Sequence, residues 1–343
     1  MASQRLEVLS ATRITAGVLC GMGAGALWGF VFLAPELIRA FSPLTLTIAR
    51  YLAYGGISAL LLAPRWHDVL TRLSRREWLG LARLGLVGNL LYYILLSLAV
   101  QNCGIAMTSL VMGFLPVVVT VAGSREHGAL PLRRLAPSLA LCGGSAICIG
   151  QQALATRATG GADHNLTGLL CAVGALVSWA WYGVTNSRWL SRLPHVTAHD
   201  WSLLTGIATG ALTLALVPVA AMVDKADHAS PDWFRLVGTS AGLALSASIV
   251  GNMLWNRMSR LLPLTLVGQM ILFETLFALL YAFVWERRLP TWLEAAAFAF
   301  VSLSVVSCVA AHARNSAKGD RDGSERGDPA KLTGTLKKCS ETR

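Results

Sequence analysis

The stretch "VGNLLYY" at residues 87–93 returns as "VGNMLWN" at residues 250–256, an offset of 163 positions. Each copy lies inside a long hydrophobic run. An asparagine amide in such a run is costly unless it finds a hydrogen-bonding partner. The sequence therefore predicts an internal repeat in which Asn89 and Asn252 occupy corresponding, functionally important positions.

A second pair of segments supports the repeat. "GVLCGMGAGALW" at 17–28 aligns with "GLLCAVGALVSW" at 168–179 at an offset of 151, which pairs Trp28 with Trp179. The shared glycines and alanines also suit close helix packing, which is an alternative explanation for them. That alternative does not account for the aromatic and amide residues that repeat with them.

The composition is that of a membrane protein. The chain is 54% hydrophobic and 14% charged, whereas soluble domains average roughly 25% charged residues. Apolar stretches of about 20 residues can cross a bilayer as helices. We predict ten such spans, at 14–34, 43–63, 79–100, 104–123, 135–154, 166–187, 201–223, 234–257, 262–285 and 290–312.

The positive charges predict the orientation. With the N-terminus in the cytoplasm, inner segments hold 14 of the 29 Lys and Arg residues, outer segments hold 6, and the tail after residue 313 adds 8. This bias places both termini inside. The charges form no continuous basic patch, so we expect no nucleic acid partner.

Two halves of five spans follow from this count. Because five is odd, the second half enters the membrane from the opposite face, and inverted repeats of this kind suit alternating access in transporters. We expect an all-α integral membrane protein divided into a cytoplasmic N-terminus, a first repeat, an outer linker, a second repeat and a disordered basic cytoplasmic tail, at 1–13, 14–154, 155–165, 166–313 and 314–343.

The repeated helices supply candidate substrate-binding residues. Positions i, i+3 and i+4 share a helix face, so each copy of the repeat presents amide and aromatic groups on one stripe, which suits a small amphipathic solute. Interhelical hydrogen bonding with aromatic packing is the structural alternative. The candidates are Trp28, Asn89, Tyr92, Tyr93, Trp179, Trp181, Asn252, Trp255, Asn256 and Gln269.

Two ionisable residues fall within predicted spans. Glu274 is a candidate for proton coupling or for binding a substrate amine, and a permanently protonated structural glutamate is the alternative. Arg50 either reaches outward to the interface or attracts a substrate carboxylate, with Tyr54 one turn away.

The motifs resemble the drug/metabolite transporter superfamily, specifically its EamA-type members. "WGFVF" at 28–32 is similar to an element of that family's first helix, and Pro116 matches a proline near the end of its fourth. Glu274 and Glu286 fit family positions in the second half, although Thr275 and Trp285 replace the family's proline and glycine. The tryptophan-rich sequence looks most like the bacterial aromatic amino acid exporters, which implies a plasma-membrane exporter.

No motif supports an enzyme. The chain has no HExxH, Walker or CxxC sequence, and its seven cysteines show no metal-ligand spacing. Its one GxSxG match, "GTSAG" at 238–242, lies inside the predicted span 234–257 and not at the strand-to-helix turn that such a nucleophile needs. We therefore expect no catalytic residue, no cofactor and no metal. The resemblance and the repeat together predict export of aromatic amino acids, with other neutral amino acids as further candidate substrates. Export of other small metabolites or drugs, or a membrane-embedded enzyme or scaffold without transport, are the alternatives, and a monomer is left open.

Overall fold

The chain is helical throughout the part that the structure, a computed structural model, describes. Within those residues there is no β-strand, as the sequence predicts. The predicted polar tail after residue 313 lies outside them. The described residues are 2–70, 73–118, 132–157, 162–193, 196–224, 229–261, 264–304, 306–307 and 310.

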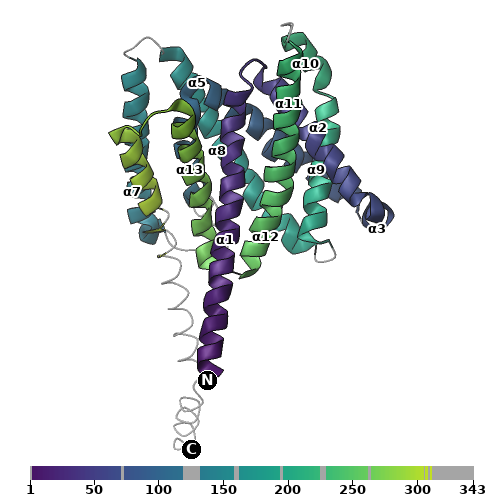
Figure 1. The fold of residues 1–343 in the computed structure, drawn as a ribbon, viewed down its shortest axis with the longest axis horizontal. Helices are drawn as coiled ribbons and strands as arrows, with labels where there is room; N and C mark the ends of the chain where they lie inside the picture. The colour runs from purple at the N-terminus through teal and green to yellow at the C-terminus, as the bar shows by residue number, and fades with distance from the viewer. Residues whose placement is uncertain are drawn as a thin grey trace, which may run out of the picture.

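The helices pack side by side into a bundle, with the N-terminal part of α1 extending beyond it at one end (Figure 1). In chain order they are α1 (Ala2–Leu37), α2 (Pro43–Leu62), η1 (Ala63–Arg65), α3 (Trp66–Leu70), α4 (Arg75–Arg83), η2 (Leu84–Leu91), α5 (Tyr92–Met112), α7 (Leu132–Arg157), α8 (Ala162–Arg192), α9 (Ala198–Leu214), α10 (Val217–Val223), α11 (Ser230–Leu243), η3 (Ala244–Gly251), α12 (Asn252–Leu261) and α13 (Leu264–Glu286). A further apolar helix spans Trp292–Ser304.

Several of these helices can cross a membrane by length and composition. In the described part, five segments qualify, and α9 with α10, bent by 51° at a short break, counts as a sixth. Each falls within or overlaps a predicted span. The five segments are Thr15–Leu37, Pro43–Val69, Arg75–Met112, Asn165–Leu190 and Ser230–Met258. The arrangement as ten spans in two inverted repeats stays a prediction.

The link between the third and fourth predicted spans is shorter than expected. The sequence suggests "QNCG" at 101–104 as the connection, yet Gln101 to Cys103 are helical and only Gly104 leaves the helical region, with φ 83° and ψ 168°. A positive φ is accessible to glycine at little cost because glycine has no Cβ. One residue therefore separates the two helical parts of α5.

Two segments are π-helical rather than α-helical. They are η2, which contains Asn89, and η3, which ends at Gly251 beside Asn252. π-Helical turns are rare and occur frequently at functional sites. The repeated stretches 87–93 and 250–256 thus each overlap a π-helical segment.

The helices α2 and α9 pack closely, and their flanking segments are also linked. A Cβ added to Gly55 would lie 2.9 Å from the Gly210 Cα, so the two backbones nearly touch. Arg65 of η1, which follows α2, places its Nη2 2.9 Å from Asp200 Oδ1 of α9. The Thr45 hydroxyl of α2 donates over 2.9 Å to Oδ2 of Asp224, the residue that follows α10. α2 with η1 is thus joined to α9 with α10 at three places.

The helices α1 and α13 also approach closely because α1 presents glycine to its neighbour. A Cβ at Gly25 would lie 2.9 Å from the backbone nitrogen of Glu274 and 2.7 Å from the Phe273 Cβ. Small residues at such contacts let helix backbones approach in membranes. The position of Glu274 relative to α1 therefore depends on Gly25.

Gly25→Ala is expected to destabilise the protein by about 1–3 kcal/mol, the usual cost of overpacking. The added methyl group meets backbone atoms of α13 that cannot rotate away. Gly56→Ala is the matched control, because Gly56 has no atom within 4 Å of the added Cβ, and the helix propensity of alanine should stabilise it by up to about 1 kcal/mol. Thermal unfolding in detergent measures both. Equal midpoints for the two variants would contradict the packing described above.

Candidate functional site

Three aromatic rings from two helices stack in the interior. Tyr92 of α5 lies on Trp179 of α8 with ring centroids 4.9 Å apart. Trp179 in turn lies on Tyr182, at 4.7 Å and an interplanar angle of 11°. Gly88 makes room for Tyr182, because a Cβ there would lie 2.1 Å from its ring. We call Tyr92, Trp179 and Tyr182 the aromatic stack.

A second aromatic pair joins α1 to α12. Trp28 and Trp255 have ring centroids 5.1 Å apart. The Trp28 indole N–H donates to the carbonyl of Ala247 in η3 over 3.0 Å. A Cβ at Gly251 would lie 2.7 Å from that indole nitrogen. Trp28 thus packs on the helix that carries the second "VGN" stretch, as Tyr182 packs on the helix that carries the first.

The two repeated asparagines make interhelical contacts with α9. Asn89 is 9% exposed, and its Nδ2 donates to the Thr209 hydroxyl over 2.9 Å. Asn252 Nδ2 donates to the Ser202 hydroxyl over 3.3 Å and to the Ser248 carbonyl over 2.8 Å. This is the structural alternative that the sequence left open. In this conformation both amides join their own helical segments to α9 by hydrogen bonds.

The expected single stripe of Asn89, Tyr92 and Tyr93 is not a single surface. Asn89 contacts α9, Tyr92 contacts α8, and Tyr93 lies against Tyr51 of α2 with centroids 6.0 Å apart. The helix is surrounded by neighbours, so adjacent positions on one face meet different helices.

Arg50 is buried among tyrosines. Its side chain is 6% exposed, and its guanidinium carbon lies 4.1 Å from the Tyr93 ring centroid and 5.2 Å from that of Tyr51. The outward-reaching side chain that the sequence allowed is therefore wrong for this structure. Tyr54, one turn further along α2, donates its hydroxyl to the Ser202 carbonyl over 2.7 Å. We call Arg50, Tyr51, Tyr54 and Tyr93 the Arg50 cluster.

The remaining candidates are placed differently. Glu274 of α13 is partly buried, and its backbone lies against Gly25 of α1. Trp181 is 39% exposed, and its role in substrate binding stays a prediction. Asn256 is half-buried. The side chain of Gln269 lies outside the described part of the structure.

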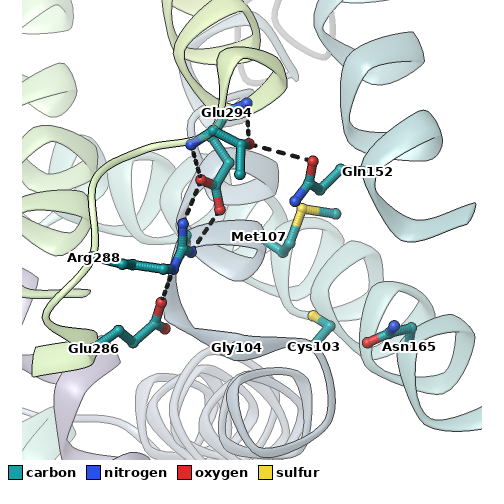
Figure 2. Close-up of a pocket in the computed structure, with 10 residues that line it drawn as sticks. Cys103, Gly104, Met107, Gln152, Asn165, Glu286, Arg288 and Glu294 are labelled. Carbon is teal, nitrogen blue, oxygen red and sulfur yellow. Dashed lines mark hydrogen bonds and ion pairs between the residues drawn. The ribbon is translucent and has the colours of Figure 1, made fainter. Parts of the chain in front are cut away.

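A cavity of about 370 Å³ opens beside Gly104 (Figure 2). It is separate from the aromatic stack and is lined by polar and apolar groups from several helices. Its lining residues are Cys103, Gly104, Ala106, Met107, Gln152, Asn165, Glu286, Arg288, Thr291 and Glu294.

Arg288 organises this cavity. It donates to both oxygens of Glu294, each over 2.7 Å, and to Glu286 over 2.5 Å. The Thr291 N–H donates to the same Glu294 carboxylate over 2.8 Å. The hydrogen bonds to Glu294 raise the pKa of the Arg288 guanidinium above its ordinary value, against the opposing effect of burial. The acid and base groups here satisfy one another and so hold the loop between α13 and the next helix.

The aromatic stack and the Arg50 cluster offer ring faces, hydroxyls and one positive charge. Within the described residues, no group of three or more His, Cys, Asp or Glu is placed to hold a metal. Sequence reasoning missed Tyr51, Ser202 and Thr209. Tyr51 follows Arg50 directly, and only the fold shows that both lie against Tyr93.

Comparison with known proteins identifies the class to which this chain belongs. The sequence model of the EamA-like transporter family matches residues 15–127 and 166–309. The chain is therefore a member of the EamA-like transporter family, a membrane family within the drug/metabolite transporter superfamily. Among curated proteins, Inner membrane protein YtfF of Escherichia coli (strain K12) is 31% identical over 316 residues, covering 86% of this chain and 95% of YtfF.

One solved crystal structure shares the fold. It aligns with a TM-score of 0.55 over 86% of this chain and 97% of that chain, at 20% sequence identity. At that identity the likeness concerns the fold alone.

Proposed function

We propose that this protein exports amino acids, aromatic ones among them, from the cytoplasm by alternating access between two inverted five-helix repeats. It acts in the inner membrane, with both termini in the cytoplasm. The inner-membrane name of its relative YtfF supports the location. The excess of Lys and Arg in the inner segments supports the orientation.

The observation that carries the proposal is how the repeated aromatic residues pair. By the sequence offsets, Trp28 corresponds to Trp179 and Tyr92 to Trp255. Trp28 contacts Trp255, and Trp179 contacts Tyr92. Each contact joins one residue of the first half to one of the second, and exchanging the halves converts one contact into the other. Two interfaces related in this way suit a cavity that opens alternately to each side.

Helix packing supports the same exchange. α1 packs on η3 and α12, and α8 packs on η2 and α5. In the proposed repeat α1 corresponds to α8, and η2 with the part of α5 before Gly104 corresponds to η3 with α12. The family match also falls on two separate segments, one in each proposed half.

The substrate class rests on the stacked rings. Flat aromatic surfaces bind aromatic and other apolar groups, and the neighbouring hydroxyls and amides suit the polar end of an amino acid. Export of another small metabolite would use the same ring surfaces and polar groups. The transport assay below distinguishes the two.

The test is release from liposomes that contain purified protein and labelled amino acids. Protein-dependent release of tryptophan or phenylalanine is the expected result. Release of other metabolites, with no amino acid released, would overturn the amino acid assignment. A pH gradient tests coupling: if Glu274 carries the proton, Glu274→Gln abolishes the gradient-dependent part of release. An unchanged gradient response in that variant would exclude Glu274 from coupling.

A further inference from the structure

Arg50 is a buried positive charge that has no anionic partner among the residues that the structure describes. Its Nε and Nη1 atoms have no hydrogen-bond partner among the described residues. In the same part of the chain no carboxylate forms an ion pair with it, whereas Arg39, Arg65, Arg235 and Arg288 each lie within 4 Å of one. A charged group in the middle of a membrane protein is costly, and arginine in such a place marks a functional site by default.

The tyrosine rings compensate this charge only in part. The guanidinium lies over the Tyr93 ring at 4.1 Å and near that of Tyr51 at 5.2 Å, both within the range of cation–π attraction. Rings attract the charge but accept no strong hydrogen bond from its N–H groups. A guanidinium can form two parallel hydrogen bonds with a carboxylate. The Arg50 guanidinium therefore keeps N–H donors that such a carboxylate could use.

The position of Arg50 links it to the aromatic stack. Its guanidinium carbon lies 4.1 Å from the Tyr93 ring centroid, and Tyr93 directly follows Tyr92, which stacks on Trp179. A solute with a carboxylate and a flat side chain complements this arrangement better than a simple anion does.

We propose that Arg50 binds the carboxylate of the transported solute and that the protein therefore selects zwitterionic amino acids over their uncharged-carboxyl analogues. This inference rests on the proposed function and names the group that confers its selectivity. In the present conformation the guanidinium is enclosed, and the rings of Tyr51 and Tyr93 occupy its surroundings. The carboxylate reaches it when the helices separate on one side.

The experiment measures binding of phenylalanine and phenylalaninamide to purified protein, together with their release from liposomes. The wild type is expected to bind phenylalanine more tightly than the amide. Arg50→Gln should weaken phenylalanine binding by about 10- to 100-fold, the range for losing hydrogen bonds to a charged group. Its affinity for the amide should stay unchanged, so the preference disappears. Arg50→Lys, which keeps the charge without the fork, should retain part of it.

Arg235→Gln is the matched control, because the Arg235 side chain is 73% exposed and lies outside both clusters. It should leave the preference intact. An Arg50→Gln variant that is monodisperse and still prefers phenylalanine would overturn the inference. If Arg50→Gln does not fold, the wild type and Arg50→Lys decide the matter: equal binding of phenylalanine and its amide by the wild type, or an undiminished preference in Arg50→Lys, overturns the inference.

The outcomes separate this inference from the proposed function. A wild type that releases phenylalanine and phenylalaninamide equally well leaves amino acid transport standing and overturns the role of Arg50. A wild type that binds and releases no amino acid overturns the proposed function, and the inference falls with it.

Discussion

Gly88→Ala is expected to reduce transport to background. The added Cβ would lie 2.1, 2.5 and 2.7 Å from the Cδ2, Cγ and Cβ atoms of Tyr182. Atoms so close to the root of a side chain cannot move aside without moving the backbone of α8. The displacement would separate Tyr182 from Trp179, now 4.7 Å apart, and so dismantle the aromatic stack. Release of labelled phenylalanine from liposomes measures the effect.

The matched control for Gly88→Ala is Gly183→Ala. Gly183 directly follows Tyr182 on α8, and nothing lies within 4 Å of its added Cβ, so transport should be unchanged. The double variant Gly88→Ala with Tyr182→Ala should recover thermal stability without recovering transport, because the clash is gone but the stack is not restored. A Gly88→Ala protein that transports like the wild type would show that the stack is not needed.

Arg288→Gln is expected to lower stability substantially. Glu294 is 3% exposed and would lose two hydrogen bonds of 2.7 Å each. Removing one partner of a buried ion pair costs about 3–5 kcal/mol. Because the Arg288 side chain is 36% exposed, water screens part of this interaction, and we expect a loss of about 1–3 kcal/mol. The midpoint of thermal unfolding in detergent gives the measurement.

A second substitution separates the pair from general damage to the loop. Arg288→Gln combined with Glu294→Gln leaves no buried carboxylate unpaired and should regain part of the lost stability. Arg235→Gln removes an exposed contact of 3.9 Å with Asp232 and should change stability by less than about 0.5 kcal/mol. A double variant no more stable than Arg288→Gln would contradict the assigned role of the ion pair.

The sequence predicts the helical membrane fold because long apolar runs leave few alternatives in a bilayer. It also predicts a substrate-binding role for four repeated aromatic residues, because their repetition is visible without a structure. These are Trp28, Tyr92, Trp179 and Trp255. The π-helical turns of η2 and η3 are not predictable in this way. An apolar sequence has a similar pattern whether its backbone hydrogen bonds join residues four apart, as in an α-helix, or five apart, as in a π-helix.

The positions of two site candidates, Trp181 and Arg50, also have a physical reason. Trp181 is two residues from Trp179, and two steps along a helix turn a side chain to nearly the opposite face. It is accordingly 39% exposed while Trp179 is stacked. Arg50 and Tyr93 are far apart in sequence, and their contact depends on how α2 and α5 pack. Hydrophobic pattern carries no information about that packing.

The close contact between α2 and α9 has a mechanical consequence. Sliding α2 past α9 by a single turn would require about 5.4 Å and would break the contacts of Arg65 with Asp200 and of Thr45 with Asp224 together. The touching backbones at Gly55 and Gly210 leave no space for the two helices to move closer. We therefore expect α2 and α9 to move as one unit. In the proposed exchange between inward-open and outward-open forms, the other helices would then turn about this pair of helices and not about a flexible loop.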